Sequence, residues 1–234
     1  MRKMLIVMLL LLVAGSAAAR ELTPLKTDLA PPVEPYNGVT CIAGNDNLGA
    51  ILGYYDAWFL GYENYAVPIN AGASGCACGE GVAITTIHML IALDEFANLD
   101  VAVAILDAET DGAGCLSPGA EIAVSPAFNI SGLAVGAAYY DIAIPIDGPC
   151  ATTGDAQFLA FYFLNDNDSQ FFGLPITDPP NACFNYNDWG AGYTDVVDAY
   201  GFAGDIPIWA EMTCCNAPVA TDESSFGSIK SLFR

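Results

Sequence analysis

Basic residues are almost absent from this sequence. It holds 6 Lys and Arg against 27 Asp and Glu, which gives a formal net charge of -21 at pH 7. Because nucleic acid is bound through a basic surface, this balance excludes a nucleic-acid partner. No Lys or Arg lies between residues 27 and 229. We therefore expect a folded body without salt bridges and without a cationic clamp for phosphates or oxyanions.

Motifs for catalysis are also missing. The chain has a single histidine, His88, inside the apolar stretch Thr86–Leu90, and no GxSxG motif supplies a serine nucleophile. We predict a structural role for His88 and a protein that is not an enzyme. A glycoside hydrolase that uses two acidic residues ranks lowest, because so many acids allow almost any pair to be proposed.

Only one long apolar run occurs, at the N-terminus. Met4–Ala14 follows Arg2 and Lys3 and precedes the small residues Ala17–Ala19, which is the three-part pattern of a signal peptide. The run is well short of the ~20 residues that span a bilayer. We expect cleavage after Ala19, no membrane span in the mature chain, and a secreted, extracellular or cell-surface protein, with the periplasm as a further location.

Cysteine, by contrast, is plentiful. An even number of cysteines in an exported chain predicts a disulfide framework, and zinc is disfavoured because the chain has no CxxC pair and one histidine. Close cysteines seldom bond to each other, so we expect each to reach a different partner, with the pairing left open. The eight are Cys41, Cys76, Cys78, Cys115, Cys150, Cys183, Cys214 and Cys215.

The body of the chain has the pattern of an all-β protein. Short apolar runs alternate with Gly, Asn, Asp and Pro, without a convincing helical period. We predict a disulfide-stapled antiparallel sandwich of two sheets, jelly-roll or immunoglobulin-like, with about eight strands. The predicted strands include Tyr65–Ile69, Val82–Leu93, Val101–Leu106, Glu121–Val124, Tyr139–Ile146, Gln157–Leu164 and Ile208–Cys214.

Four segments make up the predicted organisation. A signal peptide (1–19) and an extended Pro-rich lead-in (20–36) precede the sandwich domain (37–217), and a linker with a C-terminal tail (218–234) follows it. The tail Phe226–Arg234 is apolar and basic, unlike the body. It is interpreted as an address label read by export or sorting machinery, or as a terminal segment that packs on the fold.

Oxygen-rich turns are candidate calcium sites. The many acidic residues are interpreted either as a solvated acidic surface or as binding sites for divalent cations. Asp107 and Asp111 begin a stretch like an EF-hand loop, which fails because its twelfth position is Pro118. Asp166 and Asp168 form a second such turn, and Asn45–Asn47 a third. Each is also explained as a plain Asn and Asp turn.

Aromatic residues form the last candidate site. Tyr186, Trp189 and Tyr193 lie in a polar, Gly-rich stretch beside Asn185, Asn187 and Asp188. Aromatic faces on loops stack on sugars, so this stretch predicts a glycan platform. The alternative is that Trp189 caps the core of the sandwich.

Several motifs together carry a resemblance. They are Cys76–Gly79, Thr86–Met89, Asn187–Tyr193, Trp209–Glu211 with Cys214–Cys215, and the ending Gly227–Arg234. With them the chain resembles a recurrent group of uncharacterised secreted bacterial β-sandwich proteins, some with a Gly-x-Ile-Lys-x-Leu-aromatic-Arg tail. The resemblance implies location and fold, and no activity. We expect a non-catalytic structural or adhesion-type module at a surface, with a calcium-stabilised carbohydrate-binding module as the alternative and a surface glycan or envelope component as partner.

Overall fold

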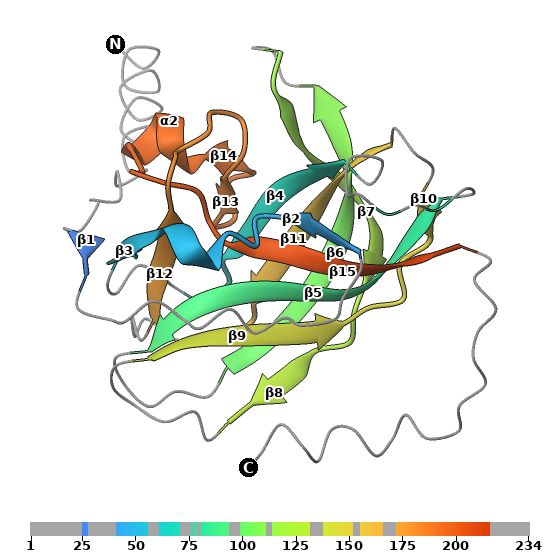
Figure 1. Cartoon of the computed structure of the whole chain (residues 1–234), viewed down its shortest axis with the longest axis horizontal. Helices are drawn as coiled ribbons and strands as arrows, with labels where there is room; N and C mark the ends of the chain where they lie inside the picture. The colour runs from blue at the N-terminus through green and yellow to red at the C-terminus, as the bar shows by residue number, and fades with distance from the viewer. Residues whose placement is uncertain are drawn as a thin grey trace, which may run out of the picture.

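The computed structural model describes residues 25–27, 41–55, 61–70, 76, 78, 81–93, 99–110, 114–131, 138–151, 155–165 and 172–215. Almost all of the regular structure in these residues is β, in two antiparallel sheets packed together (Figure 1). The predicted signal peptide and C-terminal tail lie outside the described residues, as does most of the predicted lead-in. The all-β sandwich predicted from the sequence is confirmed.

The first sheet has eight strands, in the order β1-β3-β12-β5-β15-β2, with β9 and β10 also paired to β5. In Figure 1, β15, β5 and β9 run side by side across the front of the molecule. The strands are β1 (Leu25–Lys26), β2 (Ile42–Gly44), β3 (Ile51–Tyr55), β5 (Val82–Leu93), β9 (Ala138–Pro145), β10 (Cys150–Ala151), β12 (Phe172–Thr177) and β15 (Ile208–Cys214).

The second sheet has seven strands, in the order β14-β13-β4-β11-β6-β7, with β8 also paired to β6. Its strands β11 and β6 cross behind the first sheet in Figure 1. The strands are β4 (Asn64–Asn70), β6 (Leu99–Thr110), β7 (Leu116–Val124), β8 (Phe128–Ile130), β11 (Ala156–Phe163), β13 (Tyr186–Asp188) and β14 (Thr194–Asp195).

The main core lies between the sheets. Alternate residues of β11, such as Leu159 and Phe161, belong to the same buried cluster as Ile87, Met89 and Ile91 of β5. A bulge between Ile84 and Thr86 shifts the alternation of β5, so that Ile87, Met89 and Ile91 face inward as Val82 and Ile84 do. His88 and Leu90 consequently lie on the outer face, where Leu90 joins a separate cluster with Leu48 and Trp209.

A row of alanines crosses the outer face of the second sheet. Ala160 of β11 lies directly opposite Ala66 of β4 and Ala104 of β6, and the row continues to Tyr186 and Val124. The three alanines are fully buried, and they form a second cluster with Tyr186 and two larger residues of β6 and β11. Because alanine leaves space above the sheet, larger side chains can pack down onto this row.

All seven strands predicted from the sequence are present. Val82–Leu93 and Ile208–Cys214 have the predicted bounds, whereas the strand predicted at Glu121–Val124 begins at Leu116. The predicted number of about eight strands is too low, because the described residues hold fifteen. The strands not predicted include β2, β3, β12 and β13, which are short and obtain their stability from pairing rather than from a local pattern.

A short α-helix and a 3-10 turn, η1 (Leu48–Ala50), interrupt the β structure of the described residues. α2 (Val196–Tyr200) begins at Asp195, whose side chain accepts hydrogen bonds from the backbone N–H groups of Val197 and Asp198. It ends at Gly201, whose left-handed φ of 72° suits glycine. Among the described residues, no helix is long and apolar enough to cross a membrane.

Four disulfides connect the eight cysteines, as predicted. The expectation that close cysteines reach different partners is also confirmed, because Cys76 and Cys78 bond elsewhere, as do Cys214 and Cys215. Three bonds join strands of the first sheet, or segments that lead into or out of them, and the fourth joins the β6–β7 connection to the segment before β13. The pairs are Cys41–Cys76, Cys78–Cys214, Cys150–Cys215 and Cys115–Cys183.

Candidate functional site

The three predicted glycan-stacking residues do not share one exposed face. Tyr186 is 3% exposed, packs edge-on against Phe158 with ring centroids 5.5 Å apart, and donates its hydroxyl hydrogen bond to the carbonyl of Leu116. Tyr193 is half-buried against the same outer cluster. Only Trp189 lies apart from that cluster. It is half-buried beside Tyr200 of α2, at 5.4 Å between ring centroids.

The loop that carries Trp189 is built on Asp188. Its carboxylate oxygen Oδ1 accepts hydrogen bonds from the backbone N–H groups of Gly190, at 2.7 Å, and Gly192, at 2.9 Å. Both glycines have left-handed φ values, 96° and 94°, a conformation that costs other residues about 1 kcal/mol or more. Asp188 and the two glycines therefore fix the loop conformation that positions Trp189.

A pair of phenols lies beside this loop on the outer face. Burial raises the pKa of Tyr162, and the nearby Tyr193 and a hydrogen bond of 3.0 Å from its hydroxyl to Glu121 Oε1 act in the same direction. Burial also raises the pKa of Tyr193. Both hydroxyls therefore stay protonated at neutral pH, where they can form hydrogen bonds but cannot serve as bases.

Of the four predicted calcium ligands, only Asp107 lies in the described residues. Asp111, Asp166 and Asp168 lie outside them. Asp107 is exposed near the end of the inner face of β6, and its Oδ1 accepts a hydrogen bond from the N–H of Ala108 at 2.9 Å. It lines a pocket of about 400 Å³ together with Asp155 and Gln157.

Sequence reasoning did not connect Asp155 or Gln157 with Asp107. The sheet register does, because Gln157 of β11 lies directly opposite Asp107 of β6. Asp155 precedes Gln157 by two residues, which places both on the same side of the chain. The alternation within the predicted strand Gln157–Leu164 was the available signal, since it puts Gln157 on the face of Leu159.

The third oxygen-rich turn, Asn45–Asn47, is used structurally. The amide of Asn45 donates hydrogen bonds to Thr177 Oγ1, at 2.8 Å, and to the carbonyl of Ile206, at 3.2 Å. Close by, the buried Asn185 donates to Asp205 Oδ1 at 2.7 Å. These bonds join β2 and β12 to the segment before β15, which agrees with the interpretation of this turn as a structural one.

His88 lies within ion-pair distance of two carboxylates, although the sequence predicted a folded body without salt bridges. Its side chain is 1% exposed and stacks on Trp209, with ring centroids 5.0 Å apart. Its Nδ1 lies 3.0 Å from Asp141 Oδ1, and its Nε2 lies 3.6 Å from Glu211 Oε1. That expectation counted only Lys and Arg, and the contacts of His88 become ion pairs only when its ring is protonated. When protonated, His88 is a cation between carboxylates from the two strands that flank β5.

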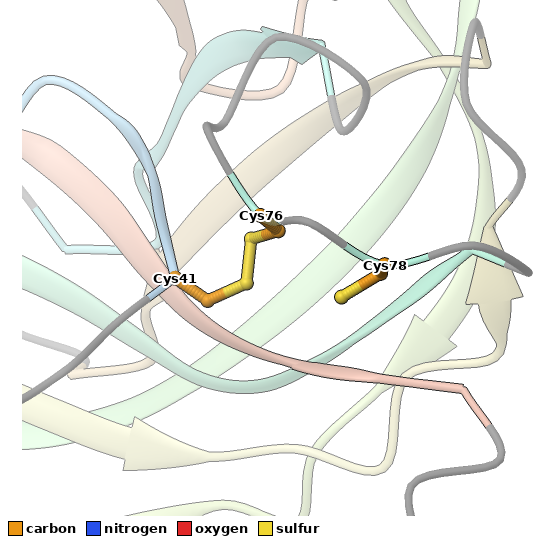
Figure 2. A group of neighbouring side chains, drawn as sticks. All are labelled: Cys41, Cys76 and Cys78. Carbon is orange, nitrogen blue, oxygen red and sulfur yellow. A yellow bond between two sulfur atoms is a disulfide. The ribbon is translucent and has the colours of Figure 1, made fainter.

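Three sulfur atoms form a group of potential metal ligands in the described part of the chain. Those of Cys41, Cys76 and Cys78 lie within 4.8 Å of one another. Figure 2 shows Cys41 and Cys76 joined by a disulfide, with Cys78 beside them. Cys78 is bonded in turn to Cys214. As cystines these sulfurs are not thiolates, which are the form that binds zinc.

Comparison with known proteins gives one match. No curated protein and no solved structure matches the chain. A family model described as a domain of unknown function, DUF7451, matches residues 69–212. The match covers more than half of the chain, from the end of β4 into β15, and includes the pocket at Asp107, His88 and the loop of Trp189. The chain therefore belongs to the DUF7451 family.

Proposed function

We propose that this protein is a secreted or cell-surface module with a structural or adhesion role, and that it carries out no catalysis. The disulfide framework is the observation that supports this most directly. All eight cysteines are paired, and such bonds persist in oxidising compartments outside the cytosol. Three of them cross-link the chain at or beside strands of the first sheet. Such bonds stabilise the module outside the cytosol.

The edge strand β7 offers a surface for a partner. Its side chains Leu116, Ile122 and Val124 are 39%, 41% and 51% exposed. Exposed apolar side chains grouped on an edge strand are typical of contact surfaces. Pro118, in the same strand, has no N–H group to donate, which limits uncontrolled pairing with other strands.

Fractionation of cells that express the full chain tests the location. We expect the protein outside the cytoplasm with no thiol accessible to alkylation unless it is first reduced. A reduced, cytoplasmic protein would contradict the proposal. Deleting Phe226–Arg234 tests the tail, and unchanged export and surface retention would rule out its role as an address label.

Surface retention tests the adhesion role. We expect the double variant Ile122→Ser and Val124→Ser to release the protein from the envelope fraction into the medium. Leu52→Ser is the matched control, because Leu52 is 37% exposed but belongs to the first sheet. Equal retention of both variants would contradict the role of β7.

A glycan-binding module is the second candidate, with calcium as a possible stabiliser. The pairing of Trp189 with Tyr200 favours it, since two half-buried rings meet on a loop and a helix at the surface. Trp189→Ala separates the two roles of this ring. Loss of glycan binding at an unchanged melting temperature would support a platform, whereas a lowered melting temperature would support a core cap.

A further inference from the structure

The sulfurs of two disulfides lie side by side. The sulfur of Cys78, which is bonded to Cys214, lies within 4.8 Å of both sulfurs of the Cys41–Cys76 bond. Figure 2 shows the Cys78 side chain pointing toward that bond. A change of side-chain rotamer moves a cysteine sulfur without moving the backbone. Cys78 therefore needs only a local rotation to contact the neighbouring disulfide.

The backbone around these sulfurs is held by contacts other than the disulfides. The N–H of Met212 in β15 donates a hydrogen bond of 3.0 Å to the carbonyl of Cys41. Cys214 lies opposite Val82 in the pairing of β15 with β5, and Val82 follows Cys78 by four residues. If the bond between Cys78 and Cys214 opens, these contacts keep the Cys78 sulfur beside its neighbour.

Burial divides the four cysteines into two inner and two outer residues. Cys41 and Cys78 are 6% and 8% exposed, whereas Cys76 and Cys214 are partly exposed. An external thiolate therefore reaches the Cys214 end of its bond more readily than the Cys78 end, and attack at Cys214 leaves Cys78 as the thiolate. Because burial disfavours a charged sulfur, this thiolate is favoured to return to a disulfide.

We propose that Cys78 exchanges its disulfide partner from Cys214 to Cys41 when an external thiol attacks. The external thiolate bonds to the Cys214 sulfur, which breaks the Cys78–Cys214 bond and leaves a mixed disulfide at Cys214. The Cys78 thiolate then attacks the Cys41 sulfur, forms a Cys41–Cys78 bond and releases Cys76 as the thiolate. Two bonds form and two break, and no electrons are gained or lost overall.

This exchange makes Cys214 a covalent attachment site for a thiol-bearing partner. Cys41 is the target rather than Cys76, because cysteines separated by a single residue seldom bond to each other. The new bond keeps the segment before β2 joined to the segment before β5, and β15 keeps the bond of Cys150 with Cys215 beyond its end. The chain therefore stays cross-linked while it takes up the thiol. This inference goes beyond the proposed adhesion role and does not depend on it.

The oxidised full chain with Cys214→Ser tests the exchange, because it begins with Cys78 as the unpaired thiol. After incubation at neutral pH, acid stops the exchange, which requires a thiolate. Thiols are labelled with N-ethylmaleimide in acidic denaturant, the disulfides are reduced, and the thiols so released receive a second label. Mass spectrometry with fragmentation then identifies which of Cys41, Cys76 and Cys78 carries the first label.

We expect the first label at Cys76 on at least about a tenth of the molecules, and at Cys78 on the rest. Cys115→Ser is the matched control, because it also removes one disulfide but leaves Cys183, which is not in the group of three sulfurs, as the thiol. Its first label should stay on Cys183. In the parent protein, a limiting amount of glutathione should give an adduct at Cys214 together with a thiol at Cys76.

Three results would overturn the proposal. The first is a label confined to Cys78 in the Cys214→Ser variant or, if that variant does not fold, in the parent molecules that carry glutathione at Cys214. The second is glutathione bound at other cysteines but never at Cys214. The third is a first label spread over many cysteines in the Cys115→Ser control as well, which would attribute the exchange to unfolding rather than to the proximity of the sulfurs.

Discussion

Replacing His88 by Phe tests whether its contacts with carboxylates stabilise the fold. Phenylalanine keeps an aromatic ring stacked on Trp209 but removes the 3.0 Å contact between Nδ1 and Asp141. Losing a hydrogen bond to a charged group, with its partner left buried, costs about 1–3 kcal/mol. The Asp141 side chain is 23% exposed, so water recovers part of this. We therefore expect a loss of about 1–2 kcal/mol in the free energy of unfolding.

Urea unfolding of the oxidised protein measures this loss. The double variant His88→Phe and Asp141→Asn should cost less than the sum of the two single changes, by about 0.5 kcal/mol or more, because the two side chains interact. Asp147→Asn is the control and should stay within about 0.5 kcal/mol of the parent protein. If His88→Phe is as stable as the parent, His88 contributes packing alone and the reasoning from its carboxylates is wrong.

Three further predictions concern the fold. Replacing Cys115 and Cys183 by Ser opens a bond between cysteines 68 residues apart and should cost about 4 kcal/mol by the chain-entropy relation, measured by denaturant unfolding without reductant; an unchanged midpoint would contradict it. Ala160→Val should overpack the alanine row and lower stability by about 1–3 kcal/mol, whereas Ala120→Val at an exposed position of β7 should not. Burial raises the pKa of Asp195 above 3.8, against the hydrogen bonds that it accepts from Val197, Cys183 and Asp198. Its contribution to stability is therefore lost as the pH rises from 3.8 through its raised pKa. Asp195→Asn, which keeps the helix cap, should remove that loss when the two unfolding curves are compared across this pH range, and parallel curves would refute it.

The fold was predictable where the signal is local. Val82–Leu93 is rich in β-branched residues, and its bounds follow from composition alone. β2 and β13 have three residues each, which is too few to show a period. They form because the backbone groups of β15 and β4 are available to hydrogen-bond with them. Tyr186 was assigned to an exposed loop because its neighbours are polar, yet it faces the alanine row of strands distant in sequence.

The candidate site was predictable only in part. Asp107 was singled out from its own turn, but its partner across the sheet, Gln157, is 50 residues away and is identified only by the register of β6 and β11. His88 was interpreted as structural from its apolar neighbours. Asp141 and Glu211 could not be assigned to it, because the sequence does not show that β9 and β15 are the neighbours of β5.

The position of β15 determines when this chain can finish folding. β15 is the last strand of the described residues, yet it lies inside the first sheet between β5 and β2. Until Ile208–Cys214 has left the ribosome, β5 and β2 each lack a neighbour, and Cys78 and Cys150 lack the partners that β15 and the next residue supply. The first sheet can therefore be completed only after β15 has been synthesised, and a chain cut before β15 would expose two strand edges and two free thiols, a combination that favours aggregation and incorrect cross-linking.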